Sequence, residues 1–164
     1  MNKNKIKIII SWFLVILWML VIFSFSHMNG DNSNSKSKGT INKILETTNK
    51  VGITNVDITA GKEAEAVDKL NGPLRKLMHM GVYFILALLV INALRVSNVK
   101  FNLTYLLTFI ICFIYACTDE YHQTLISDRS GEFRDVLIDS FGSIIGILFN
   151  YLLLRIRKVI KKKS

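Results

Sequence analysis

Four stretches of mostly apolar residues, separated by polar segments, dominate the pattern of this chain. They lie at about residues 8–26, 78–95, 101–118 and 136–154. A helix needs about 20 mostly apolar residues to cross the hydrocarbon core of a bilayer. The second and third stretches are slightly short, so we expect their helices to include flanking polar residues. The pattern therefore predicts an all-α, polytopic membrane protein with four transmembrane helices in one domain over residues 1–164.

The long polar segment between the first two stretches, residues 27–75, is predicted to be a helical outer loop. Its beginning, residues 27–39, is rich in Gly, Ser and Asn, as irregular segments often are. Residues 41–48 then place apolar side chains at helical spacing. They predict a short amphipathic helix, lying either on the outer leaflet or on its own bundle. A second helix is predicted to start near Lys62 and to end at Pro73, because proline disfavours helical backbone in the residue before it.

The charge pattern predicts the orientation in the membrane. The net charge is +9 although the mean hydropathy is +0.36, a combination that excludes an ordinary soluble domain. Basic residues gather in three groups: Lys3, Lys5 and Lys7, then Arg95 and Lys100, then the tail from Arg155. With four crossings all three groups fall on one side, which the positive-inside rule assigns to the cytoplasm. We therefore predict a multi-pass cell-membrane protein with both termini cytoplasmic, the lipid bilayer as a partner and no nucleic-acid partner.

The first apolar stretch is predicted to be a retained anchor, because it exceeds the usual core of about 7–15 residues in a signal peptide and no Ala-x-Ala-like site follows it. Two cysteines, Cys112 and Cys117, lie in the third stretch. At this spacing they point to different faces of a helix, so they cannot pair with each other. We interpret both as packing residues.

The connection between the third and fourth stretches carries most of the candidate chemistry. Its ionisable and amide side chains are Asp119, Glu120, His122, Gln123, Arg129, Arg134 and Asp135. At a membrane boundary such groups are costly unless they pair with each other, with water or with a ligand. We expect Thr118–Gln123 to continue the third helix by one turn and Ser127–Gly131 to form a turn.

Two acids and an imidazole within four residues suit several kinds of site. They can bind a divalent metal, act in acid–base catalysis, or hold a cationic or phosphorylated head group. No single metal signature matches this segment, so the sequence does not identify a metal or a cofactor. The alternative is a structural hydrogen-bond network that closes the outer mouth of the bundle.

Lys76, His79 and Tyr83 share one helix face at the outer end of the second stretch. A lysine and a tyrosine at this depth are typical membrane anchors, and we predict that role for Lys76 and Tyr83. A histidine just inside a span usually faces the bundle interior and has a partner. His79 is therefore a candidate for a functional role.

The fourth stretch has acids at its outer end and small residues below them on the same face. Asp135 and Asp139 align with Gly142 and Gly146, whose spacing allows two helices to approach closely. A carboxylate one turn inside the bilayer must find a partner, so we expect Asp139 to face the bundle and to pair with a basic group. The candidates at the right depth are Arg134, Arg129, Lys76 and His79.

The order and spacing of several motifs are specific: Ser24-Phe25-Ser26, Lys76-x-x-His79-x-x-x-Tyr83, Asp119-Glu120-x-His122-Gln123 and Arg129-Ser130-Gly131-x-x-x-Asp135-x-x-x-Asp139-x-x-Gly142-x-x-x-Gly146. Together they resemble the VanZ-like family of bacterial membrane proteins over residues 8–154. The family commonly has a Ser-Ser-Gln-like motif after its first span, whereas Phe25 and His27 flank Ser26 here. The founding member is associated with low-level resistance to teicoplanin, a glycopeptide that acts on the outer face of the envelope. The resemblance therefore implies an envelope role without a defined reaction.

Our leading hypothesis is an envelope protein that binds or modifies an outer-leaflet lipid or a cell-wall-linked molecule. In an enzymatic version, Glu120 or His122 would be the general base, and Asp119 and Asp135 would orient it or hold a metal. The residues expected to bind the head group are Lys76, His79, Gln123, Arg129, Arg134, Asp135 and Asp139. The alternative is a non-enzymatic packing or partner-binding module with a structural polar cluster. A transporter is less favoured because the chain has four spans and no inverted second half.

Overall fold

The computed structural model describes residues 3–26, 60–125 and 132–163, together with Gly39, Lys43 and Thr47. Its helices are α1 (Lys3–Ser26), α3 (Ala60–Val96), α4 (Phe101–Gln123) and α5 (Phe133–Lys163). Among these described residues all regular secondary structure is helical and none lies in a strand, which confirms the predicted fold class.

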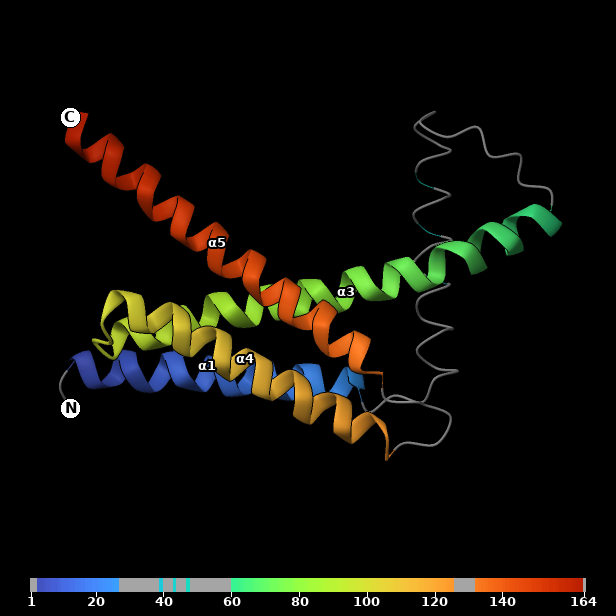
Figure 1. The fold of residues 1–164 in the computed structure, drawn as a ribbon, viewed down its shortest axis with the longest axis horizontal. Coiled ribbons are helices and arrows are strands. Elements are labelled where there is room, and N and C mark those ends of the chain that lie inside the picture. Colours follow the sequence, from blue (N-terminus) through green and yellow to red (C-terminus); the bar gives the residue numbers. More distant parts are fainter. Residues whose placement is uncertain are drawn as a thin grey trace.

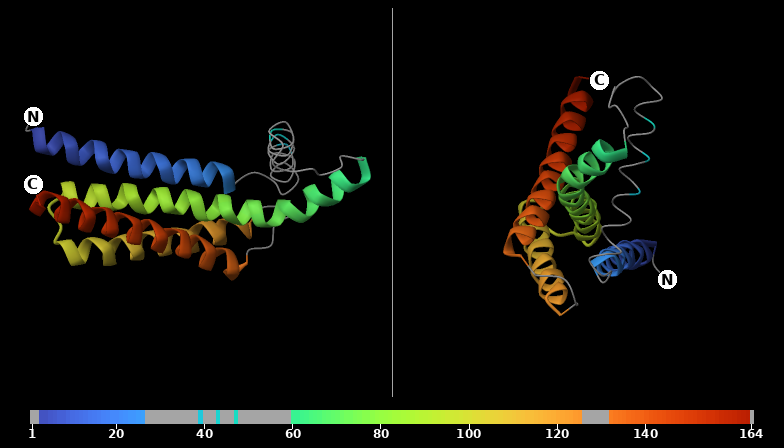
Figure 2. Two further views of the ribbon diagram at one scale, coloured as in Figure 1. Left: turned by 90° about the horizontal axis from the view of Figure 1, so that it is seen from above. Right: turned by 90° about the vertical axis from the view of Figure 1, so that its right-hand side faces the viewer.

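Each of the four helices contains a segment long and apolar enough to cross a membrane. The segments are Lys3–Ser26, Lys76–Val96, Phe101–Gln123 and Phe133–Lys161. The second and third extend into flanking polar residues, as predicted, and α4 continues through the turn expected at Thr118–Gln123. The start of α1 and the end of α5 lie at the same end of the bundle (Figures 1 and 2), as an even number of crossings requires.

Helix α3 runs through Pro73, so the prediction that this proline ends a helix is wrong. Proline lacks a backbone N–H and removes one helical hydrogen bond, but the turns on either side supply the others. The N-terminal part of α3 projects beyond the other helices, and Figure 2 shows α3 bending as it leaves the bundle. Pro73 therefore lies within one long helix instead of separating two.

The predicted helix over residues 41–48 falls almost entirely outside the described residues. Lys43 and Thr47 are the described members of that segment, and both are helical. The Thr47 hydroxyl donates to the Lys43 carbonyl at 2.7 Å, a bond between residues one helical turn apart.

The core lies where α3 packs against the other three described helices. Its largest fully buried side chains include Tyr83, Leu86 and Ile91 of α3. Polar bonds also fasten neighbouring helices: Trp18 of α1 donates to the Val82 carbonyl of α3 at 2.9 Å. Cys112 is buried and Cys117 is half-buried, and both are free thiols, in agreement with their interpretation as packing residues.

Helices α3 and α5 approach each other along the predicted glycine seam. A Cβ atom added at Gly142 would overlap the carbonyl group of Met80, and one at Gly146 would lie 2.8 Å from the Phe84 carbonyl oxygen. Real Cβ atoms do not approach backbone oxygens this closely, so only glycine fits at either position. This close approach brings Asp139, which lies about one turn before Gly142 on α5, against the polar face of α3.

Candidate functional site

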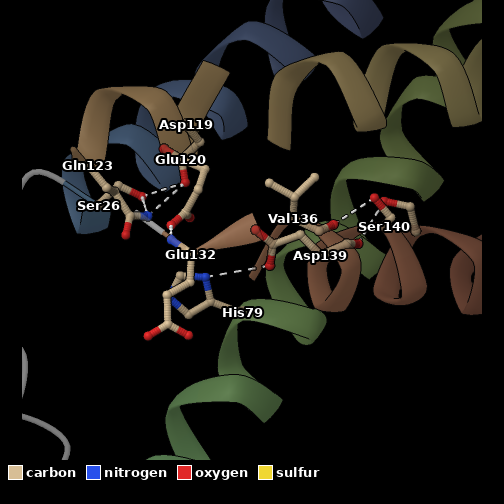
Figure 3. A network of polar contacts seen from close by, with 10 residues as sticks. Ser26, His79, Asp119, Glu120, Gln123, Glu132, Val136, Asp139 and Ser140 are labelled. Atoms are coloured by element: carbon tan, nitrogen blue, oxygen red, sulfur yellow. Dashed lines mark hydrogen bonds and ion pairs between the residues drawn. The ribbon is translucent and has the colours of Figure 1, made fainter. Parts of the chain in front are cut away.

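Polar side chains from all four described helices meet at the end of the bundle opposite the chain termini. We call this group the polar cluster, and Figure 3 shows most of it. It consists of Ser26, His79, Tyr83, Asp119, Glu120, Gln123 and Asp139. Each of the four described helices therefore supplies at least one member.

The first part of the cluster joins α1 to α4. The Ser26 hydroxyl donates to Oδ2 of Asp119 at 2.7 Å. The Gln123 amide lies one turn away on α4 and donates to the same oxygen at 3.3 Å and to the Ser26 hydroxyl at 3.4 Å. Asp119 is only 3% exposed, so these bonds replace the water that a carboxylate would otherwise hold.

Glu120 joins α4 to the beginning of α5. Its Oε1 atom accepts a hydrogen bond from the backbone N–H of Glu132 at 2.5 Å (Figure 3). Glu132 immediately precedes α5, where backbone N–H groups lack helical partners and the helix dipole favours a negative charge. Glu120 is 7% exposed, and its hydrogen bond with the Glu132 N–H holds its carboxylate at the start of α5.

The third part of the cluster joins α3 to α5. His79 Nδ1 lies 3.5 Å from Oδ1 of Asp139, and Asp139 is 1% exposed. The structure confirms that Asp139 faces the bundle and pairs with a basic group of the second span. The distance exceeds that of a good hydrogen bond, so the contact is mainly electrostatic.

Tyr83 lies one turn below His79 and is fully buried, so its predicted role as a membrane anchor is wrong. Its face of α3 points at α4 and α5 because the glycine seam draws the helices together. Its hydroxyl group interacts electrostatically with both Asp119 and Asp139. Tyr83 therefore lies within electrostatic range of the acids of two different parts of the cluster.

Three oxygen atoms of the cluster are buried without a hydrogen-bond partner among the described residues. They are the Tyr83 hydroxyl, Asp119 Oδ1 and Asp139 Oδ1. A buried polar atom without a partner is costly, and such atoms are rare in folded proteins. The Tyr83 and Asp119 atoms can therefore accept a hydrogen bond from a donor that enters the cluster, and Asp139 Oδ1 can accept one in addition to its electrostatic contact with His79.

The remaining predicted site residues differ in placement. His122 packs its ring on Phe23 of α1, with ring centres 4.4 Å apart, and lies within electrostatic range of Asp119. Asp135 is half-buried and within electrostatic range of Glu120, whereas Lys76 and Arg134 are exposed.

Two predictions for the connection before α5 fall outside the described residues. They are Arg129 as a head-group ligand and the turn at Ser127–Gly131.

The cluster carries more acid than base. Its carboxyl groups belong to Asp119, Glu120 and Asp139, whereas His79 is its single basic member. This balance suits a ligand that brings hydrogen-bond donors or a positive charge. Among the described residues, no group of three or more His, Cys, Asp and Glu side chains is arranged to hold a metal ion.

A profile of the VanZ/LLP1 family matches residues 11–155, most of the chain. The chain belongs to the VanZ/LLP1 family. This confirms the resemblance inferred from the motifs, and with the four membrane-capable helices it identifies a multi-pass membrane protein of that family. Searches of curated proteins and of solved structures returned no similar protein.

Two features of this VanZ/LLP1 site were missed in the sequence. The backbone N–H of Glu132 has no side-chain signature, although its place just before a helix could have suggested an acceptor. The burial of Tyr83 was detectable in principle, because Tyr83 shares a helix face with His79. Aromatic residues near span ends so commonly act as membrane anchors that this role was predicted for Tyr83 in spite of the shared helix face.

Proposed function

We propose that this protein binds the head group of an envelope molecule in the polar cluster, and that binding changes susceptibility to glycopeptides such as teicoplanin. The observation that carries the proposal is the set of three buried oxygen atoms without a hydrogen bond among the described residues, on Tyr83, Asp119 and Asp139, of which the Asp139 oxygen has an electrostatic contact with His79. They lie in a group dominated by carboxyl side chains. A head group that donates hydrogen bonds, such as one bearing an amine, complements them.

His79 and Asp139 support a chemical step on the bound molecule. A histidine exchanges protons near neutral pH, and a carboxylate beside one ring nitrogen orients the other. Glu120 supports that role less well, because one of its oxygens already holds the Glu132 N–H. We therefore place His79 ahead of Glu120 and His122 as the group that would move a proton.

The second candidate is a packing module in which the cluster has no ligand. One observation favours it: contacts of the cluster join different helices, α1 to α4, α4 to the start of α5, and α3 to α5. A purely structural cluster predicts that any disruptive substitution lowers the amount of protein. A binding cluster predicts that conservative substitutions abolish function at normal abundance.

Conservative variants of the cluster are expected to lose function without losing protein. Glu120→Gln keeps an oxygen for the Glu132 N–H, and Asp119→Asn keeps one for the Ser26 hydroxyl. In strains that lack the native gene, each variant should leave teicoplanin susceptibility at the level of the deletion strain. His122→Ala tests the ring beside Phe23 in the same assay. Envelope lipid profiles of the same strains detect any chemical modification.

The matched control is Glu132→Gln, which removes an exposed carboxyl group next to the cluster and leaves its backbone N–H in place. It should behave as the wild type. Protein levels are measured in parallel by immunoblotting of membranes. If every cluster variant showed wild-type susceptibility at equal abundance, the binding proposal would be rejected. The packing module would then be the favoured function.

The orientation is also a proposal, because the positive-inside rule alone supports it. In a chain carrying Cys112→Ala and Cys117→Ala, single cysteines at Ser35 and Ser130 should react with an impermeant thiol reagent added to intact cells. A cysteine at Ser164 should react only after the membrane is opened. Labelling of that tail cysteine in intact cells would reverse the orientation and place the polar cluster on the cytoplasmic side.

A further inference from the structure

A second site lies at the end of the bundle that carries the chain termini, away from the polar cluster. Figure 1 shows α5 diverging from the other helices toward its C-terminus. A cavity of about 430 Å³ lies between this part of α5 and the start of α4. Its lining residues are Phe101, Tyr151, Leu154, Arg155, Lys158 and Val159, and we call it the basic cavity. Its volume is in the range of small-molecule sites, about 300–1,000 Å³.

The cations of the basic cavity are held by neutral aromatic groups. Arg155 lies 5.3 Å from the centre of the Tyr151 ring, and its Nε and Nη2 atoms donate to the Tyr151 hydroxyl at 3.0 and 2.7 Å. Lys158 lies 5.6 Å from the centre of the Phe101 ring. These contacts orient the cations but do not neutralise them. Most donors of the guanidinium and ammonium groups are thus available to an acceptor.

A third cation approaches the same aromatic ring from α3. Arg95 lies 5.8 Å from the centre of the Phe101 ring and donates to the Tyr105 hydroxyl at 2.7 Å. Arg95 and Lys158 therefore gather around one phenylalanine although their charges repel. Such a gathering is favourable when an anion lies between the cations.

Among the residues that the structure describes, no carboxylate forms an ion pair with these cations. Residues 1–30, 69–118 and 140–164 contain no Asp or Glu, and these ranges include every residue of the basic cavity. Helix α4 begins beside it at Phe101, and its N-cap residue Lys100 makes no side-chain capping bond. The positive end of a helix dipole thus adds to the side-chain charges.

We infer that the basic cavity binds the phosphate of an anionic membrane lipid. Tyr151 is of the residue type enriched at the membrane–water boundary, where lipid phosphates lie. Leu154 and Val159 add apolar lining, which suits the glycerol and upper acyl chain of a lipid better than a free ion. This site is independent of the proposed function at the polar cluster.

The test uses the full-length protein, purified in detergent and titrated with phosphatidylglycerol, phosphatidylcholine or inorganic phosphate while bound lipid is counted by native mass spectrometry. The wild type should retain phosphatidylglycerol in preference to phosphatidylcholine. The double variant Arg155→Gln/Lys158→Gln should bind phosphatidylglycerol about tenfold more weakly, since each basic residue contributes separately to binding an anionic surface. Leu154→Trp, which fills the cavity and keeps every charge, should weaken it as well.

The matched control is Arg157→Gln/Lys161→Gln, which removes the same charge from the same helix at exposed positions outside the cavity lining. This pair should retain phosphatidylglycerol like the wild type. Thermal unfolding in phosphatidylcholine checks that each variant is folded. The inference would be overturned if both double variants lost phosphatidylglycerol binding equally. Displacement of the lipid by inorganic phosphate would overturn it as well. Unchanged binding by the folded Leu154→Trp variant would overturn it too.

Discussion

Replacing Asp139 with alanine is expected to destabilise the protein more than any other single change in the polar cluster. Asp139 is 1% exposed and lies 3.5 Å from His79, which would lose its carboxylate. Removing one member of a buried pair typically costs about 3–5 kcal/mol. A loss of this size should lower membrane abundance several-fold and reduce the unfolding temperature in detergent. Both quantities are measured against the wild type.

Two further variants show whether that loss arises from the pair. His79→Ala/Asp139→Ala should be less destabilised than the sum of the two single variants, because neither group is then left alone. Asp135→Ala removes a half-buried acid one turn earlier on α5 and should stay within about 1 kcal/mol of the wild type. Wild-type abundance and unfolding temperature for Asp139→Ala would show that the pair contributes nothing to stability.

Gly142→Ala is expected to push α3 and α5 apart. The added methyl group would overlap the carbonyl group of Met80, and this obstacle is backbone that cannot rotate away. Overpacking of this kind costs about 1–3 kcal/mol and occasionally more. Because Met80 follows His79 directly, the same displacement should weaken the contact with Asp139 and reduce function. Thermal unfolding and the susceptibility assay measure the two effects.

Gly81→Ala provides the matched control for the glycine seam. A Cβ at Gly81 meets nothing within 4 Å, although Gly81 also lies within a helix near the polar cluster. Alanine is better than glycine in a helix by about 1 kcal/mol, so this variant should be as stable as the wild type or slightly more stable. If Gly142→Ala behaved like Gly81→Ala, the close approach of α3 and α5 would not be required for folding.

The sequence by itself determined the number of membrane-capable segments, the family and the end of the bundle where polar groups gather. Hydropathy is a property of about 20 consecutive residues, so each span could be recognised without knowing its neighbours. The glycine spacing of Gly142 and Gly146 is likewise local and correctly indicated a close helix contact. The need of Asp139 for a partner followed from its depth in the membrane alone.

Only the tertiary structure decided which groups meet. Arg129, Arg134, Lys76 and His79 were equal candidates to pair with Asp139, and the structure places His79 beside it because α3 and α5 touch at the glycine seam. The same approach buries Tyr83, which the sequence alone placed at the membrane surface. Contacts between helices depend on how their faces are rotated and how closely they approach, and neither is encoded in the composition of a single span.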